Sequence, residues 1–282
     1  MRVLIVGGTS ALGTALKQSI STIGEVITAG RTNCDIHLDL NDSPEKINLP
    51  ENIDSIIHLA AKMGGSTDDE IIETINVNVL GTLKICQAAA KANVKHIVLI
   101  SSIFVSLKED SPYYGIYPIS KKQSEEIAKF YCSLHNIRLT ILRPSQIYGN
   151  EISFSRHQPF FYKMIELAEN GEDILLYGKK DPMRNYLHIE DLKIIISRVI
   201  EMGIEGTYSC AFPFDNSYSH IGNAAIAAFG SKGKLLFLQD KPDIPDNVFA
   251  KETYLYEKIG FYPQISIEEG MQIIANFRRN NK

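Results

Sequence analysis

The stretch VLIVGGTSALG at residues 3–13 runs from apolar residues into a glycine turn. The apolar residues predict a buried strand, and the residues after the turn predict a helix. Glycine lets the backbone approach a ligand closely, and a helix N-terminus attracts phosphate. The spacing is G-x-x-S-x-x-G, with Ser10 where the dinucleotide-binding fingerprint has its middle glycine. The turn predicts a pyrophosphate site, with an ordinary strand-turn-helix as the alternative.

Beyond this turn, short β-branched runs alternate with stretches of helical spacing. This alternation is typical of a parallel sheet flanked by helices. We expect strands at residues 2–6, 25–29, 36–38, 55–59, 96–100 and 138–142, and helices at 13–20, 70–92 and 119–134. The pattern predicts an α/β fold, a Rossmann-type doubly wound parallel sheet with a smaller mixed α/β substrate-capping domain.

The rhythm changes after Pro144 to mixed helices, loops and scattered aromatic residues, so a second layer is expected to begin near Gly149. Residues 1–149 are predicted to form an NAD(P)-binding Rossmann domain, with a return segment near 186–212. Residues 150–185 and 213–282 are predicted to form the substrate-binding cap. Such sheets bind ligands at the carboxyl ends of their strands, so we expect the chemistry just after each strand.

The composition of the 282 residues is that of an ordinary globular protein, with 44% hydrophobic and 22% charged residues. The formal net charge of -4 provides no positive field for nucleic acid or an anionic membrane surface. The four cysteines lie far apart with no C-x-x-C pair, which predicts no metal site and a reducing, cytoplasmic compartment. No stretch approaches the roughly 18 apolar residues of a membrane span.

A catalytic constellation follows the strand at 96–100. Ser101 and Ser102 come directly after that strand, and Tyr117-Pro118-Ile119-Ser120-Lys121 reads Y-x-x-x-K. On a helix Tyr117 and Lys121 share a face, so the ammonium is expected to favour the ionised phenol. With 13 tyrosines in the chain a Y-x-x-x-K match alone is weak, but its combination with the turn and the serines is strong. We expect Ser101, Tyr117 and Lys121 to be catalytic, with Ser101 orienting the substrate oxygen.

Cofactor preference is predicted from the end of the second strand. An NAD site usually has an acidic residue there, whereas this sequence has Arg31. Arg31 is suited to a 2′-phosphate, which favours NADP over NAD, although a surface arginine in a loop is the plainer alternative. Asp39 follows the third strand and is expected either to accept a bond from the adenine amino group or to cap its own loop.

Together these motifs resemble the extended short-chain dehydrogenase/reductase family of NAD(P)-dependent nucleotide-sugar epimerases, dehydratases and reductases. IIHLAA at 56–61 is similar to the family's fourth-strand signature, and RPSQIYG at 143–149 to its R-P-x-x-x-Y-G segment. The resemblance implies cofactor contacts from Gly7, Thr9, Ser10, Ala11, Leu12, Gly13, Arg31, Asp39, Leu40, Leu59, Ala60, Ala61, Lys62, Tyr117, Lys121 and Pro144. It implies substrate contacts from Ser102, Gln146, Arg184 and His157.

Two further segments resemble the GDP-fucose synthase branch of that family: AAKMGG at 60–65 and DPMRNYLHIEDL at 181–192. In that branch the arginine at the position of Arg184 contacts the substrate diphosphate; a pairing of Arg184 with Glu190 or Asp191 is the structural alternative. The branch also has a cysteine two residues after its catalytic serine, which moves protons in epimerisation. Here that residue is Ile103, which cannot accept or donate a proton. The branch also uses a histidine, and at its position this sequence has either His157 or Arg156. Epimerisation at C3 and C5 is therefore not expected.

The resemblance implies an NADP(H)-dependent reductase of a 4-keto-6-deoxy nucleotide sugar. In that reaction Tyr117 protonates the oxygen and Lys121 tunes Tyr117 and holds the nicotinamide ribose. One alternative is a nucleotide-sugar 4-epimerase that keeps NAD bound. A second is a dinucleotide-sensing regulator without catalysis. Family members often pair through the helices that correspond to 70–92 and 119–134, so a homodimer is expected.

Overall fold

The computed structural model describes residues 1–150 and 152–281, in two compact units. The first unit comprises Met1–Pro144, Lys193–Cys210 and Thr253–Phe261, and the second comprises Ser145–Leu192, Ala211–Glu252 and Tyr262–Lys282. The division differs in detail from the expected one, because the first unit ends at Pro144 and takes in residues 253–261. The predicted cap segments 150–185 and 213–282 each include one residue, 151 and 282, outside the described residues.

The first unit is built on a seven-stranded sheet in the order β11-β6-β5-β4-β1-β2-β3, in which every neighbouring pair is parallel. Its central strands are almost entirely buried, as expected for a parallel sheet covered on both faces. The strands are β1 (Arg2–Val6), β2 (Glu25–Gly30), β3 (Ile36–His37), β4 (Ser55–His58), β5 (His96–Ile100), β6 (Arg138–Pro144) and β11 (Gly206–Cys210). The Rossmann-type fold prediction is confirmed.

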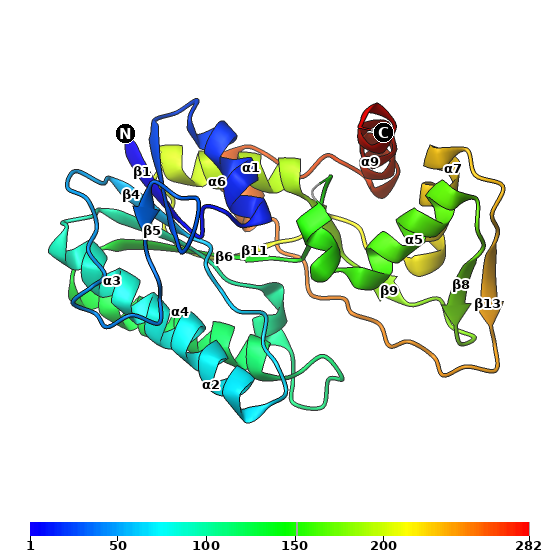
Figure 1. The fold of residues 1–282 in the computed structure, drawn as a ribbon, viewed down its shortest axis with the longest axis horizontal. Coiled ribbons are helices and arrows are strands. Elements are labelled where there is room, and N and C mark those ends of the chain that lie inside the picture. Colours follow the sequence, from blue (N-terminus) through cyan, green and yellow to red (C-terminus); the bar gives the residue numbers. More distant parts are fainter. Residues whose placement is uncertain (151, 282) are drawn as a thin grey trace. The chain divides into compact units, whose positions relative to one another are not determined.

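Helices cover both faces of this sheet. In Figure 1, α1 (Ala11–Ile20) and α6 (Ile189–Glu201) lie on one side, and α2 (Asp68–Ile75), α3 (Gly81–Lys91) and α4 (Ile116–Leu134) lie on the other. The order of the strands reverses between β1 and β4, which is where such folds bind ligands beyond the strand ends. The shorter helices of this unit are η2 (Ile103–Ser106) and α8 (Tyr254–Ile259).

The single helix expected at 70–92 is wrong in one respect, because a π-helical segment, η1 (Asn76–Leu80), separates α2 from α3. Asn78 in this segment is buried, and its side chain bonds to both backbone groups of Lys62, outside the helix. Single π-helical turns inside α-helices often mark functional sites. Here the bulge turns Asn78 toward the loop after β4.

The second unit contains three two-stranded ribbons beside helices. The ribbons pair β7 (Gln146–Tyr148) with β10 (Tyr186–His188), β8 (Ile174–Tyr177) with β13 (Leu235–Leu238), and β9 (Met183–Arg184) with β12 (Asn216–Ser217). Its helices are η3 (Ile152–Arg156), α5 (Pro159–Asn170), α7 (Tyr218–Phe229) and α9 (Ile267–Asn280). The ring of Tyr148 is fully buried under α9, where Gly270 leaves room for it. Within residues 1–150 and 152–281, no helix is both long and apolar enough to cross a membrane.

Candidate active site

The glycine turn joins β1 to α1 with the geometry of a phosphate cradle. Gly7 has φ +92°, and a Cβ on it would lie 2.9 Å from the backbone nitrogen of Ala60. A Cβ on Gly13 would lie 2.4 Å from the Gly7 carbonyl oxygen, so α1 packs directly on the turn. These positions exclude any larger residue, and they leave the N-terminus of α1 facing the strand ends. The turn therefore fits a dinucleotide pyrophosphate.

Ser10 stands where the dinucleotide-binding fingerprint has its middle glycine, and its hydroxyl has a structural role in the turn. Its hydroxyl accepts a hydrogen bond from the Gly13 amide at 3.0 Å and donates one to the Gly7 carbonyl at 2.8 Å. Ser10 is thus the N-cap of α1, a position for which serine is strongly preferred. The serine stabilises the same turn that a glycine would otherwise permit.

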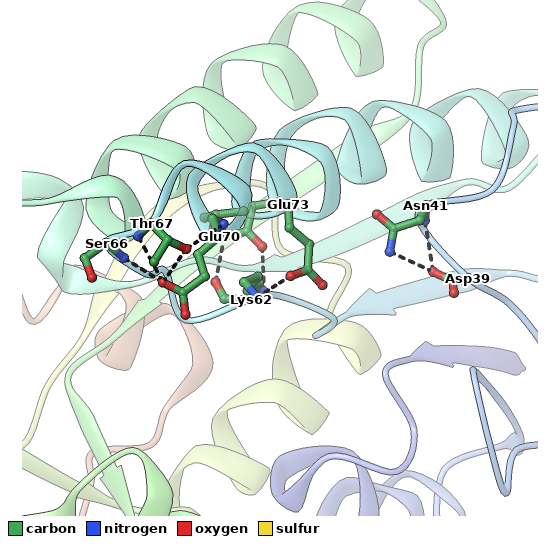
Figure 2. A network of polar contacts seen from close by, with 9 residues as sticks. Asp39, Asn41, Lys62, Ser66, Thr67, Glu70 and Glu73 are labelled. Atoms are coloured by element: carbon green, nitrogen blue, oxygen red, sulfur yellow. Dashed lines mark hydrogen bonds and ion pairs between the residues drawn. The ribbon is translucent and has the colours of Figure 1, made fainter.

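The loop that follows β4 lies beside this turn and is clamped by polar contacts (Figure 2). Asn78 accepts from the Lys62 amide at 2.7 Å and donates to the Lys62 carbonyl at 2.9 Å and to the Ser120 hydroxyl at 2.9 Å. The Lys62 ammonium pairs with Glu73. Glu70 accepts bonds from the amides of Ser66 and Thr67 and completes a capping box at the start of α2. Residues 62–67 are therefore held to α2 and η1.

The two serines after β5 have different partners. Ser101 donates its hydroxyl hydrogen bond to Glu125 Oε1 at 2.5 Å, in a buried position. Ser102 caps η2, and its side chain lowers the pKa of Tyr117, against the effect of burial. Adjacent residues in an extended segment point in opposite directions, so only one of the two serines reaches the tyrosine. The predicted role of Ser101, orienting the substrate oxygen, stays a prediction; in the structure the Ser101 hydroxyl is used by Glu125.

Tyr117 and Lys121 lie one turn apart on α4, as the spacing predicted. Burial raises the pKa of Tyr117 to about 12, against the Ser102 hydrogen bond, which lowers it. The expectation that Lys121 lowers this pKa is therefore not met in the structure. The Lys121 ammonium instead donates to the Ile100 carbonyl at 2.8 Å, and burial lowers the pKa of Lys121 to about 8, against the opposing effect of Glu125.

His58, on β4, contributes no second cation beside Lys121. Its Nε2 lies 3.2 Å from the Thr82 hydroxyl, and that hydroxyl donates to the Asn78 carbonyl at 2.6 Å. Burial, followed by the Lys121 charge, lowers the pKa of His58 to about 3. His58 is therefore a neutral core histidine at physiological pH.

Glu125 is a buried carboxylate one turn beyond Lys121. Besides Ser101 it accepts two hydrogen bonds from Arg143, at 2.9 Å from Nε and at 2.5 Å from Nη2. We call Ser101, Lys121, Glu125 and Arg143 the buried network. It joins the end of β5, the middle of α4 and the end of β6. Neither Glu125 nor its pairing with Arg143 was predicted, because no motif spacing links them.

The predicted adenosine contacts lie on the loops after β2 and β3. Arg31 is exposed at the end of β2. Asp39 accepts hydrogen bonds from the amide and the side chain of Asn41, as a loop-capping carboxylate does (Figure 2). Leu40 is buried, and its carbonyl accepts from the Lys84 ammonium at 2.7 Å. Of the other predicted cofactor contacts, Thr9 lies in the turn before α1, Ala11 and Leu12 begin α1, and Leu59, Ala60, Ala61 and Pro144 follow β4 or end β6.

The predicted substrate contacts Gln146, His157 and Arg184 belong to the second unit. Gln146 donates to the Gln158 side chain at 2.7 Å, and His157 is exposed. Arg184 is 3% exposed, its Nε donates to the Tyr218 hydroxyl at 3.0 Å, and its guanidinium lies 4.5 Å from the centre of that ring. Asp191, the alternative partner of Arg184, accepts from the amides of Gln264 and Ile265.

Several residues at the site were missed by sequence reasoning. Asn78 and Glu125 are polar residues on helical segments, and nothing in their local sequence marks them as buried. Met63 and Phe104 line a hollow beside Tyr117. In residues 1–150 and 152–281 there is no group of three or more acidic, histidine or cysteine side chains placed to hold a metal ion.

Comparison with known proteins agrees with this geometry. The profile of the NAD dependent epimerase/dehydratase family matches residues 3–211. The chain is 23% identical to GDP-L-fucose synthase of Escherichia coli over 96% of this chain and 94% of the relative. It is 21% identical to a putative UDP-glucose 4-epimerase of Methanocaldococcus jannaschii, over 99% of both chains.

The fold is also shared with solved structures. A variant of the UDP-glucuronic acid 4-epimerase from Bacillus cereus, in complex with UDP-4-deoxy-4-fluoro-glucuronic acid and NAD, superposes with a TM-score of 0.82. It is 18% identical, and the match covers 100% of both chains. The resemblance read from the motifs is confirmed by the profile match, and the regulator without catalysis loses support because the family consists of enzymes. The chain belongs to the NAD-dependent epimerase/dehydratase family.

Proposed function

We propose that the protein is an NADP(H)-dependent reductase of a 4-keto-6-deoxy nucleotide sugar. The observation that carries this proposal is that Tyr117 lies one helical turn from the buried ammonium of Lys121, with Ser102 placed so that it lowers the pKa of Tyr117. A tyrosine with a hydroxyl partner and a nearby cation is suited to giving a proton to a carbonyl oxygen. Among the described residues at this strand end, no other side chain combines these features.

The proposed roles follow from the contacts. The turn at Gly7 would hold the pyrophosphate of a nicotinamide dinucleotide, which would supply the hydride. Ser102, rather than Ser101, orients the carbonyl oxygen beside the Tyr117 hydroxyl, and Tyr117 donates the proton. Lys121 stabilises the ionised tyrosine that results, and the Ile100 carbonyl fixes the direction of its ammonium.

Counted from Ser101, the position at which fucose synthases have their cysteine is Ile103, and the residue two positions after Ser102 is Phe104. Neither side chain transfers a proton, so the lack of a proton carrier there supports reduction at C4 without epimerisation at C3 or C5.

The test is the absorbance at 340 nm when the protein is mixed with NADPH or NADH and a panel of 4-keto-6-deoxy nucleotide sugars. We expect loss of NADPH with one nucleotide series. Tyr117→Phe is expected to slow this loss by about 10²- to 10⁴-fold, and Ser102→Ala to slow it more than Ser101→Ala does. Equal rates for Tyr117→Phe and the unchanged protein would contradict the proposal.

Preference for NADP(H) is supported by Arg31, whose exposed guanidinium follows β2. The nearby carboxylate of Asp35 accepts two bonds from Thr28, at 2.8 and 2.7 Å, which ties it to β2. We expect Arg31→Ala to weaken NADPH binding about tenfold or more, as for the loss of a charge-assisted phosphate contact, and to leave NADH binding nearly unchanged. Fluorescence titration with both cofactors measures the ratio.

A 4-epimerase with bound NAD is the second candidate, and it is favoured by the 4-epimerases among the relatives and solved structures. The same Ser102, Tyr117 and Lys121 serve it, because the proton is removed and then returned at one oxygen. Release of NAD on denaturing the purified protein, with no consumption of added NADPH, would favour this candidate over the reductase.

We also propose a homodimer. Several large apolar side chains are exposed on the helices of one sheet face, with Ile72 on α2 58% exposed and Phe130 and Leu134 on α4 67% and 64% exposed. Exposed apolar patches of this kind often mark an interface. Light scattering should give twice the chain mass, and Phe130→Glu should give a single chain mass.

A further inference from the structure

Two cysteines meet in the core of the first unit, between helices α3 and α4. Cys86 lies in the middle of α3 and Cys132 lies near the end of α4, and the two helices pack against each other on one face of the sheet (Figure 1). Their Sγ atoms are 4.0 Å apart, and each residue is only 1% exposed. Neither thiol belongs to the candidate active site.

The distance between the two sulfur atoms brings a covalent bond within reach. A disulfide requires the sulfur atoms to come to about 2 Å from each other. Rotation of a cysteine side chain about its Cα–Cβ bond moves the sulfur over a comparable distance. Free cysteines also pack in cores as small apolar residues, which is the alternative explanation of this pair.

The two thiols differ in their surroundings. Cys132 is one of the residues that line a cavity of about 730 Å³ beside the start of β6 and β11, and Cys86 is not among them. The charged residues of the described lining are three cations and one carboxylate: Lys95, Lys129, Arg138 and Glu205. A positive environment favours the thiolate, which is the nucleophilic form of cysteine. The cavity therefore distinguishes Cys132 as the more reactive thiol.

The hydrogen bond within the pair acts in the same direction. It lowers the pKa of the Cys132 thiol, against the effect of burial. The same hydrogen bond, together with burial, raises the pKa of Cys86. At Cys210, another buried cysteine of this unit, burial raises the pKa to about 12. Cys132 is therefore the thiol of the pair that ionises first, beside a Cys86 that keeps its proton.

We propose that Cys132 and Cys86 form a peroxide-sensitive pair that closes to a disulfide between α4 and α3. The Cys132 thiolate attacks one oxygen of a hydroperoxide, so that an S–O bond forms and the O–O bond breaks, and the leaving oxygen takes up the proton that Cys132 released. The Cys86 sulfur then attacks the Cys132 sulfur. The S–S bond forms, the S–O bond breaks, and the Cys86 proton leaves with the hydroxide as water. The two thiols lose two electrons, which reduce one hydroperoxide.

The disulfide has a consequence for the candidate active site. It closes a loop over a separation of 46 residues, which restricts the unfolded chain and so stabilises the folded one. Because α4 also carries Tyr117 and Lys121, the bond ties the helix of the candidate active site to α3. The oxidised protein should therefore stay folded at temperatures that unfold the reduced protein.

The experiment uses the full chain with Cys34, which is partly exposed, replaced by alanine. The protein is treated with hydrogen peroxide and then denatured, and its free thiols are counted with a chromogenic thiol reagent. We expect the count to fall from three to one, and peptide mass mapping to find Cys86 joined to Cys132. The midpoint of thermal unfolding should rise by on the order of 5 °C. Dithiothreitol should reverse both changes.

Single substitutions test the order of the two steps. Cys86→Ala removes the second thiol, so Cys132 should accumulate as a sulfenic acid that dimedone labels. Cys132→Ala removes the thiol that reacts first, so Cys86 should remain a free thiol. Cys210→Ala is the matched control, because Cys210 is also buried, and it should leave the disulfide between Cys86 and Cys132 unchanged.

The outcomes decide between a reactive pair and plain core packing. Three free thiols after a treatment that fully oxidises glutathione would overturn the proposal, and so would a crosslink that includes Cys210. Labelling of Cys86 in Cys132→Ala as fast as that of Cys132 in Cys86→Ala would overturn the assigned order. The thiol count and the crosslink map are made with both cysteines present, so they decide the proposal even if a variant at Cys86 or Cys132 fails to fold.

Discussion

The first unit contains two networks of glutamate carboxylates with basic and polar partners, one buried and one partly exposed. In the buried network, Glu125 binds Arg143 and Ser101 with its carboxylate side chain only 2% exposed. In the loop network of Lys62, Glu70 and Glu73, the Glu73 side chain is 45% exposed. A buried carboxylate must keep all its partners, whereas an exposed one exchanges them for water at little cost. We infer that the buried network fixes the positions of β5, α4 and β6, and that the loop network makes only a small contribution to the position of residues 62–67.

Lys121→Met is the change with the largest expected effect, because it removes the ammonium one turn from Tyr117 while roughly keeping the length of the side chain. Turnover should fall by about 10²-fold or more. The free energy of unfolding should rise at pH 7 in this variant. Burial lowers the pKa of Lys121 from 10.5 to about 8, so a charged Lys121 destabilises the folded state at that pH.

The pH dependence gives the sign of this effect. Between about pH 8 and pH 10.5 the unfolded chain holds more protons at Lys121 than the folded one, so this residue's contribution to stability rises with pH. Lys121→Met should therefore unfold at a higher temperature than the unchanged protein at pH 7, with the gap closing by about pH 10. A gap that widens over this range would show that the ammonium stabilises the fold.

Glu125→Gln is expected to lower the free energy of unfolding by about 3 kcal/mol, because Arg143 loses the partner of a largely buried ion pair. Urea unfolding measures it. Glu126→Gln, at the next and exposed position of α4, is the control and should stay within about 0.5 kcal/mol. If the two variants behave alike, the contrast between buried and exposed networks is lost.

Gly64→Ala probes the point where the loop after β4 meets the start of α4. Because Gly64 has φ +96° and faces the Tyr117 Cβ, we expect the free energy of unfolding to fall by about 1–2 kcal/mol. We also expect turnover to be about tenfold lower. Gly115→Ala is a close control, since a Cβ there has no heavy atom within 4 Å and the backbone is extended. Thermal unfolding and steady-state rates report both effects, and equal rates in the two variants would show that the loop does not position Tyr117.

Lys62→Met should have the smallest effect. It should lower the free energy of unfolding by no more than about 1 kcal/mol, because the ion pair of Lys62 with Glu73 is partly exposed. That loss should shrink further in 0.5 M salt, since salt screens exposed charges. A loss comparable to that of Glu125→Gln would mean that the loop network stabilises the fold as much as the buried network does.

Local patterns made much of the first unit predictable. The apolar runs at 2–6 and 96–100 became β1 and β5 with the expected bounds, and the turn at Gly7 and the Tyr117–Lys121 spacing lie where the pattern placed them. These features depend on neighbours within a few residues. The π-helical break at Asn78 was not predicted, and the Asn78 side chain within it bonds to Lys62, sixteen residues earlier in the chain, a contact that no local pattern reveals.

The partners of Ser101 and Ser102 could not be predicted from the neighbouring sequence. The sequence alone determined the parallel sheet, the phosphate turn, and the presence of a serine, a tyrosine and a lysine at one strand end, because hydrophobic period and turn chemistry are local properties. Only the tertiary structure decided that Ser101 turns to Glu125 and Ser102 to Tyr117. Neighbouring residues of an extended chain face opposite ways, and which way meets α4 depends on packing between β5, α4 and β6.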